Sequence, residues 1–202
     1  MNFSHPLASA PKPVAFFCSL MLAVLFSSQS FAVDVSGVKV DDRIRLANQD
    51  LVLNGAGMRK KFVINVYVAA LYLAEKKSTP ADVQALTTPK RVTLYIQREV
   101  SSDEFGQLFI TSMNKNSTKE EKAKVISQTG KFGEMFASLD KVKKGDVIHL
   151  DWVPGQGTIS TVNGKVTGEV LPDIAFYNAV LRIWLGDSPA QDDLKDALLG
   201  KK

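Results

Sequence analysis

Apolar residues in the first half of the chain follow strand-like patterns. Residues 38–40 and 43–46 alternate apolar and polar side chains, which predicts two short edge strands followed by a turn at residues 48–50. After a glycine-flanked break at residues 55–57, residues 62–68 are rich in β-branched and aromatic side chains. This segment predicts a central strand that can bury one or both of its faces.

Two later regions repeat the strand pattern. Residues 91–98 alternate strictly, with Val92, Leu94 and Ile96 on one face, and predict a half-buried strand. Three more segments form a predicted meander: residues 147–153, 158–162 and 165–170. The last two are joined by Asn163-Gly164, a pair that strongly favours a tight hairpin turn.

Helix signals lie between these strand regions. Thr79 followed by Pro80 predicts a short helix, with the threonine as cap and the proline at the first helical position. Ser101 and Thr118 each stand three residues before a glutamate, which is the pattern of a capping box. They predict two amphipathic helices.

Helix signals return at the end of the chain. One predicted helix begins at Pro172 and ends at about residue 185, and a second begins at Ser188-Pro189-x-Gln191 and stops before Gly200. Strands, helices, strands and helices in that order indicate an α+β fold, because parallel βαβ units would alternate one for one. We therefore expect an antiparallel β-sheet covered on one face by a layer of α-helices.

The first 32 residues have the pattern of a secretory signal peptide. Lys12 precedes a 13-residue apolar run, residues 14–26, and small residues occupy the −3 and −1 positions of a cut after Ala32. The run is shorter than the roughly 20 residues that span a bilayer, so an N-terminal anchor and a lipid-modified Cys18 are the less favoured alternatives. We expect one domain, residues 33–202, exported to the periplasm, with no integral membrane span in the mature chain.

Composition narrows the chemistry. The 202 residues are 45% hydrophobic and 23% charged, as in an ordinary globular domain. Removing residues 1–32 removes the one cysteine and Lys12, which lowers the net charge from +4 to +3. A nucleic-acid partner is not expected at this charge. With His149 as the one remaining histidine, we expect no metal site and no cofactor.

Three patterns offer candidate chemistry from the residues alone. His149 lies on the same strand face as Asp151, so a general base can be drawn, although a histidine at the rim or surface is the simpler interpretation. Ser188 precedes a proline at a predicted helix start, which favours a cap over a nucleophile. Gly55-x-Gly57 lacks the third glycine and the following helix of a phosphate loop, so we expect it to allow a tight turn before Arg59.

Two separated motifs match one known family. The first is LxGxGxR followed by KFxxxVYVAALYL in residues 53–73, and the second is IWLGDSPAQDDLKDALLG, residues 183–200. Together they resemble the chalcone isomerase-like family, in its secreted bacterial branch, and the resemblance covers most of residues 33–202. It implies an open-faced sandwich of antiparallel sheet and helices. It also implies one of two activities: closure of a chalcone to a flavanone by intramolecular conjugate addition, or non-catalytic binding of fatty acids or other hydrophobic ligands.

The resemblance also assigns residues. Arg59 falls on the arginine that attracts the substrate's anionic oxygen in the enzymes, and Tyr67 falls on the hydroxyl side chain of the next strand. On the helix, Phe105 replaces the enzymes' tyrosine and Ser112 their asparagine. A phenyl ring can neither hold water nor donate a hydrogen bond, and losing a positioned polar group of this kind costs roughly 10²-fold or more. Ser188 matches a serine near the pocket mouth.

One geometric condition follows. Arg59 and Tyr67 are eight residues apart, about 26 Å along a straight strand. They can act on one ligand only if the chain bends or turns near Lys60-Lys61.

We therefore predict a non-catalytic, cofactor-free periplasmic protein that binds a hydrophobic molecule with an anionic head, such as a fatty-acid carboxylate, between sheet and helices. Seven residues are expected to contact the ligand: Arg59, Tyr67, Phe105, Phe109, Ser112, Met113 and Ser188. For Phe105, Phe109 and Met113 the alternative is simple core packing. The alternative function is a cofactor-independent isomerase or intramolecular lyase acting on a chalcone-like conjugated carbonyl. A third possibility is an interaction protein of the cell envelope with a vestigial pocket, whose protein partners the residues do not identify.

Overall fold

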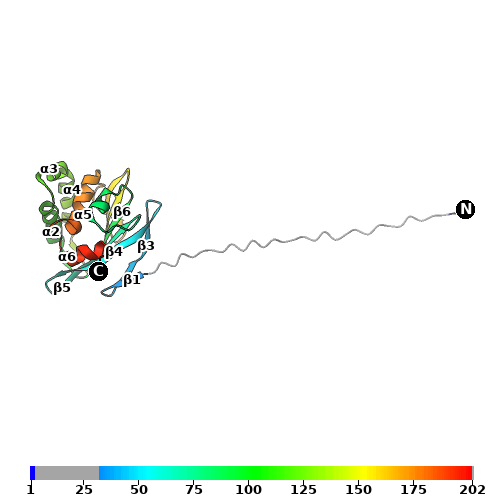
Figure 1. Ribbon diagram of the computed structural model, residues 1–202, viewed down its shortest axis with the longest axis horizontal. Coiled ribbons are helices and arrows are strands. Elements are labelled where there is room, and N and C mark those ends of the chain that lie inside the picture. The colour runs from blue at the N-terminus through cyan, green and yellow to red at the C-terminus, as the bar shows by residue number, and fades with distance from the viewer. Residues whose placement is uncertain (3–31, 202) are drawn as a thin grey trace.

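The computed structural model describes residues 1–2 and 32–201. Its main element is a seven-stranded antiparallel sheet (Figure 1). The order across this sheet is β11-β10-β9-β6-β5-β4-β3. Its strands are β3 Arg43–Leu46, β4 Gln49–Lys61, β5 Ile64–Leu73, β6 Lys90–Ile96, β9 Val147–Val153, β10 Gly157–Val162 and β11 Lys165–Val166. Two small two-stranded antiparallel sheets accompany it: the hairpin of β1 Ala32–Val35 with β2 Val38–Asp41, and the pair of β7 Val100–Ser101 with β8 Lys141–Val142, whose strands lie on either side of the helical region, residues 102–137, in the chain.

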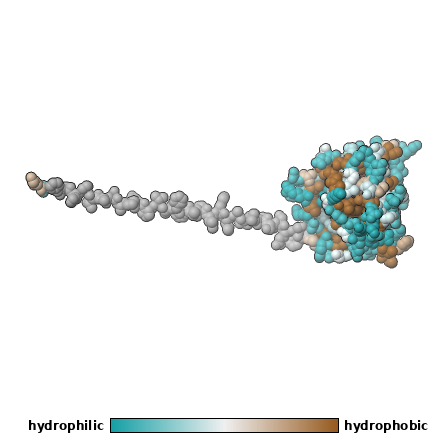
Figure 2. Space-filling model, turned by 180° about the vertical axis from the view of Figure 1, so that it is seen from behind, coloured by the Kyte–Doolittle hydropathy of each residue, from teal (hydrophilic) through white to brown (hydrophobic). Residues whose placement is uncertain are grey.

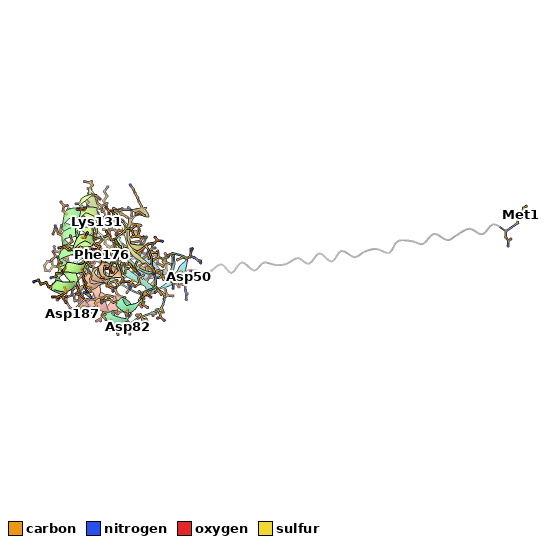
Figure 3. The ribbon with its side chains drawn as sticks, turned by 90° about the horizontal axis from the view of Figure 1, so that it is seen from above. Met1, Asp50, Asp82, Lys131, Phe176 and Asp187 are labelled. Carbon is orange, nitrogen blue, oxygen red and sulfur yellow. The ribbon has the colours of Figure 1, made fainter. Side chains whose placement is uncertain are left out.

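The described residues form helices that lie on one face of this sheet. They are α1 Pro80–Ala85, α2 Ser102–Lys115, α3 Lys119–Lys124, α4 Ile126–Ala137, α5 Ile174–Leu185 and α6 Asp192–Leu198. In Figure 3, seen from above, Lys131 of α4 and Phe176 of α5 lie on the helical side of the molecule, and Asp50 of β4 lies at its other edge. The predicted fold class, an antiparallel sheet covered on one face by helices, is confirmed. The predicted signal peptide lies outside the described residues except for Met1, Asn2 and Ala32, which begins β1.

The helix starts follow the predicted caps in three cases. Thr79, Ser101 and Thr118 each accept a hydrogen bond from the third following backbone N–H, so α1, α2 and α3 begin where their sequences indicate. Thr118 has the complete capping box, because the Glu121 carboxylate accepts from its backbone N–H. The helix predicted from Thr118 is in fact two helices, because the chain breaks at Val125 and resumes as α4.

The predicted break at residues 55–57 is wrong. Gly55 and Gly57 lie inside β4, and the turn comes later, where Phe62 adopts a left-handed conformation with φ 55°. The glycines are needed for close packing: a Cβ on Gly57 would lie 2.8 Å from the Ala197 Cβ, and one on Gly55 would overlap the Ala197 carbonyl. Small residues in β4 therefore let α6 lie directly on the sheet.

β5 is buried on both faces, one of the two arrangements that its sequence allows. Tyr67, Ala69, Leu71 and Leu73 belong to the main core between sheet and helices. The alternate residues, including Tyr72, face the other way and form a second cluster with the β1–β2 hairpin. A bent sheet with helices above and a hairpin below holds β5 rigidly, which fixes the direction of Tyr67.

In the second half of the chain, the observed bounds of β11, α5 and α6 differ from the predicted ones. Asn163-Gly164 makes the predicted tight turn, with φ 51° and 79°, but the last strand, β11, is only two residues long. α5 begins at Ile174 with Asp173 as its cap, rather than at Pro172. α6 begins at Asp192, four residues after Ser188, so Ser188 is not a helix cap.

Candidate functional site

A cavity of about 270 Å³ opens between the β4–β5 hairpin, α2 and the connection from α5 to α6. Its apolar lining comes from Val66, Val100, Phe105, Leu108, Phe109, Ile183, Pro189 and Ala190. Its polar lining comes from Arg59, Lys61, Tyr67, Arg98, Glu104, Ser112, Lys115 and Ser188. The volume lies near the lower end of the range typical of small-molecule sites. Polar and apolar residues contribute equally to the lining.

Arg59 and Tyr67 meet in this cavity because β4 and β5 form a hairpin. They are directly opposite residues of the antiparallel ladder, so both side chains leave the sheet from the same face. The pairing register shifts between Arg59 and Lys60, and the chain reverses at Phe62-Val63. The bend that cooperation between the two residues requires is therefore present.

Tyr67 is buried in the wall of the cavity. The phenol oxygen accepts a hydrogen bond from Trp184 Nε1 at 3.0 Å. Burial raises the pKa of Tyr67 above its usual value, against the smaller opposing effects of the Trp184 N–H and the Arg59 charge. Tyr67 is therefore a neutral hydroxyl at physiological pH. Within residues 32–201 it donates no hydrogen bond, so its proton is available to an acceptor in the cavity.

Arg59 is partly exposed at the mouth of the cavity and is held there by neighbouring carbonyls. Its Nη1 donates to the Lys60 carbonyl oxygen and, at 3.4 Å, to Gln191 Oε1. Gln191 Oε1 also accepts from the Lys60 backbone N–H at 2.9 Å, which ties the hairpin to the start of α6. These partners are neutral, so the positive charge of Arg59 is free to attract an anion.

Further cations reach the same cavity, and the sequence reasoning missed them. Lys61, Arg98 and Lys115 line it beside Arg59, whereas Glu104 supplies the one negative charge among the lining residues of the described chain. Glu104 lies 3.9 Å from Lys61. Arg98 Nε is buried and has no hydrogen-bond partner among the described residues. The cavity is therefore electropositive.

The predicted aromatic residues divide between wall and core. Phe105 and Phe109 line the cavity, with their ring centroids 4.8 Å apart, and the Phe105 ring stands edge-on to Tyr67. Both rings are also almost completely buried in the main core. Met113 is buried but does not line the cavity, so the structure places it with the core. Ser112 lies on the cavity side of α2, where the resemblance placed it.

Ser188 reaches the cavity through a clamp that the sequence did not reveal. The Asn116 side chain at the end of α2 accepts from the Ser188 N–H at 2.7 Å and donates to the Ser188 carbonyl at 2.9 Å. It also donates to the Ser112 carbonyl, one turn earlier in α2. This clamp fixes the Ser188-Pro189 segment as a wall of the cavity. Trp184, the partner of Tyr67, could have been found from the IWLGDSP motif.

His149 and Asp151 lie apart from the cavity. His149 Nδ1 shares a hydrogen bond with Thr93 Oγ1 at 2.9 Å, and burial lowers the pKa of its imidazole. Asp151 makes a two-point ion pair with Arg91, with Nε 2.6 Å from Oδ1. The carboxylate is engaged, which agrees with a structural role for this pair of strand residues.

Comparison with known proteins identifies the family. The family model described as chalcone isomerase-like matches residues 32–200. The chain belongs to the chalcone isomerase-like family. A search of curated proteins finds no match. Among solved structures, a fatty-acid binding protein of Arabidopsis thaliana aligns with a TM-score of 0.60 and 14% identity, over 81% of this chain and 92% of that one. At this identity the likeness shows the shared fold.

Within this chalcone isomerase-like fold, the cavity combines a cationic mouth, a neutral phenolic donor and an aromatic interior. Such a set can hold an anionic oxygen at one end and apolar carbon at the other. Among residues 32–201 no helix is long and apolar enough to cross a membrane. In the same residues no group of three or more His, Cys, Asp or Glu side chains is placed to hold a metal ion.

Proposed function

We propose that this protein is a non-catalytic binder of a hydrophobic molecule with an anionic head, of the fatty-acid type. The observation that carries the proposal is the pairing of Arg59 with Tyr67 across the hairpin, at the polar end of an apolar cavity. A guanidinium and a neutral hydroxyl at adjacent ladder positions can donate to the same carboxylate. The Arabidopsis protein that shares the fold is itself a fatty-acid binding protein, which supports the same class of ligand.

The electrostatics of the cavity favour an anion. Arg59, Arg98, Lys61 and Lys115 outnumber Glu104 among the charged lining residues of the described chain. The unpartnered Nε of Arg98 gives a second guanidinium with a free donor. A buried donor without an acceptor costs free energy that a bound anion would recover. Arg98 thus joins Arg59 and Tyr67 in the proposed head-group site.

The apolar end of the cavity suits a hydrocarbon chain. Phe105, Phe109 and Ile183 are each nearly inaccessible to solvent, and they line the cavity together with Val66 and Ala190. Apolar area removed from water contributes about 25 cal/mol per Å². The main binding free energy would therefore come from the chain of the ligand, and the cations would fix its orientation.

The alternative, an isomerase acting on a conjugated carbonyl, lacks a proton-handling group. Phe105 stands where the resembled enzymes have tyrosine, and the raised pKa of Tyr67 keeps its phenol protonated, so that it cannot accept a proton at neutral pH. A solution of chalcone tests this alternative directly. We expect its absorbance to decay at the uncatalysed rate in the presence of the protein, and a faster decay that Arg59→Gln abolishes would establish catalysis instead.

The binding proposal is tested by mass spectrometry of small molecules released from protein purified from the periplasm of an expressing bacterium. We expect an amphiphilic carboxylate in the wild type, at least tenfold less in Arg59→Gln, and an unchanged amount in Arg45→Gln. Arg45 is a suitable control because it is an exposed arginine on β3 with a surface ion pair to Asp50. Empty wild-type protein that also ignores added fatty acid would overturn the proposal.

The location forms part of the proposal. A charged residue, a 13-residue apolar run and small residues before a cut after Ala32 support export to the periplasm and membership of the secreted bacterial branch. N-terminal sequencing of protein from the periplasmic fraction tests this. We expect Val33 as the first residue, which would remove Ala32 from the end of β1.

A further inference from the structure

The tip of the β4–β5 hairpin places large apolar side chains in water. Phe62 is 91% exposed and Val63 is 92% exposed, and Ile64 beside them is also exposed. A turn between strands normally carries glycine, asparagine or aspartate. In this same sheet the β10–β11 turn follows that rule with Asn163-Gly164. The hairpin tip is therefore an exception that neither the turn nor the core explains.

Backbone geometry at the tip strengthens this contrast. Phe62 has φ 55°, a left-handed conformation that a bulky aromatic residue seldom adopts. Such a conformation disfavours phenylalanine locally, and the exposed ring gains no packing in return within the described protein. A bulky exposed residue in an unfavourable backbone conformation indicates a functional contact with another molecule.

Basic residues form a collar below the apolar tip. Lys60 and Lys61 directly precede Phe62 and both are exposed. Glu104 is the acid that approaches Lys61, at 3.9 Å, and that pair is itself open to solvent. An apolar tip above a basic collar is complementary to an anionic lipid surface, because apolar side chains enter the acyl boundary while lysines stay with the head groups.

The same face carries the mouth of the cavity. Lys61 of the collar lines the cavity, as do Leu108 and Lys115 of α2. Leu108 is 49% exposed. An exposed apolar residue and a lysine of α2 therefore border the mouth together with Lys61 of the collar. The hairpin projects beyond the helices at the lower left of Figure 1, and the same corner in the reversed view of Figure 2 is hydrophobic.

We propose that the β4–β5 hairpin docks on an anionic lipid bilayer, with Phe62 and Val63 inserted and Lys60 and Lys61 at the head groups. The mouth of the cavity then faces the bilayer, so a lipid-derived ligand can enter without crossing water. Docking depends on the hairpin tip and not on ligand binding, so it stands or falls separately from the proposed function. A second copy of this chain is a poorer occupant, because a convex tip of three apolar residues is far smaller than the roughly 800 Å² per partner of a stable interface.

The test is cosedimentation of the purified, processed protein with vesicles of phosphatidylcholine alone or mixed with equal phosphatidylglycerol. We expect at least tenfold tighter binding to the anionic vesicles, and at least tenfold weaker binding to them by the double variant Phe62→Ser/Val63→Ser. Ile126→Ser is the matched control: Ile126 is 73% exposed and begins α4 directly after α3, and Figure 1 shows α3 at the top of the molecule and β5 at the bottom. It should bind as the wild type does.

Two further measurements separate the outcomes. Fluorescence of Phe62→Trp should shift to the blue on addition of anionic vesicles, and lipids brominated in their acyl chains should quench it. The double serine variant should keep the wild-type unfolding midpoint and its affinity for a soluble fatty acid, so that loss of docking is not loss of fold or pocket. Equal vesicle binding by the double variant, no binding by the wild type, or self-association that the serines abolish would each overturn the proposal.

Discussion

Arg59 and Tyr67 stand opposite each other on β4 and β5, so residues eight positions apart in the chain are neighbours on one face of the sheet. Each is fixed by a different part of the C-terminal region. Gln191 before α6 accepts from Arg59, and Trp184 of α5 donates to Tyr67. The hairpin and the C-terminal segment therefore build the polar end of the cavity together. The two separated motifs of the sequence therefore meet at one site.

Removing the Tyr67 hydroxyl should weaken both binding and stability. Tyr67→Phe loses the proposed donor to the ligand and leaves the Trp184 N–H buried without its acceptor. We expect a fall of about 1–3 kcal/mol in the free energy of unfolding, and at least tenfold weaker binding of a fluorescent fatty acid.

Tyr72→Phe is the control for this experiment. The Tyr72 hydroxyl donates to the Asp41 carbonyl on the other face of the sheet, away from the cavity. This variant should lose stability but keep its affinity. Equal affinities of Tyr67→Phe and wild type would exclude Tyr67 from the head-group site.

The glycines of β4 should tolerate no side chain. Gly57→Ala would bring a methyl group within 2.8 Å of the Ala197 Cβ and 3.0 Å of Leu194, so α6 must move. We expect a loss of about 1–3 kcal/mol in urea unfolding, as for other overpacked sites.

A glycine elsewhere calibrates that loss. Gly130 lies in α4 with nothing within 4 Å of an added Cβ. Gly130→Ala should therefore stabilise the protein by about 0.5–1 kcal/mol, since alanine is the better helix former. A neutral Gly57→Ala would mean that α6 does not pack on β4 in solution.

Local sequence signals predicted much of the fold because they act over a few residues. The caps at Thr79 and Thr118, the Asn163-Gly164 turn and the alternation in β6 each depend on neighbouring side chains and backbone. Local signals gave no sign of the hairpin turn at Phe62, because its residues are apolar and carry no turn chemistry. A turn near Lys60-Lys61 was expected only on the condition that Arg59 and Tyr67 act on one ligand. Gly55 and Gly57 were misread as a turn because their cause, α6, lies some 140 residues away in the chain.

The residues of the candidate site that were predicted are those that the family resemblance assigned. Arg59 and Tyr67 were assigned by motif, and the structure brings them together. Arg98 was missed because it is the last residue of the predicted strand, where the sequence pattern does not show that its side chain lines the cavity. Met113 has the same helical spacing as Phe105 and Phe109, but periodicity identifies a buried face and not which part of that face borders a cavity.

The Asn116 clamp should support the cavity wall. Asn116→Ala removes three hydrogen bonds, two to Ser188 and one to Ser112, and leaves the backbone groups of Ser188 without these partners. We expect about 1–3 kcal/mol less stability and weaker ligand binding, because the Ser188-Pro189 wall is no longer fixed. Asn116→Ala should make amide hydrogen exchange at Ser188 faster than in the wild type, by more than it changes exchange in β6. Unchanged exchange at Ser188 would show that the segment is held by other contacts.

Lys90 should give the protein a pH dependence between about pH 8 and pH 10. Its ammonium is fully buried, donates to the Leu86 and Val83 carbonyls, and has no carboxylate partner among the described residues. Burial lowers the pKa of Lys90 from 10.5 to about 8. Above pH 8 the folded protein therefore binds fewer protons at this site than the unfolded chain does, so stability rises with pH up to the unfolded value.

A difference measurement isolates this effect. The free energy of unfolding should rise from about pH 8 to about pH 9.5 more steeply in the wild type than in Lys90→Met, by up to about 1 kcal/mol per pH unit. Burial raises the pKa of Tyr67, Tyr72 and Tyr177, which lowers stability at still higher pH, but these phenols are present in both proteins and cancel. Parallel pH profiles of the two proteins would mean that Lys90 reaches solvent and keeps an ordinary pKa.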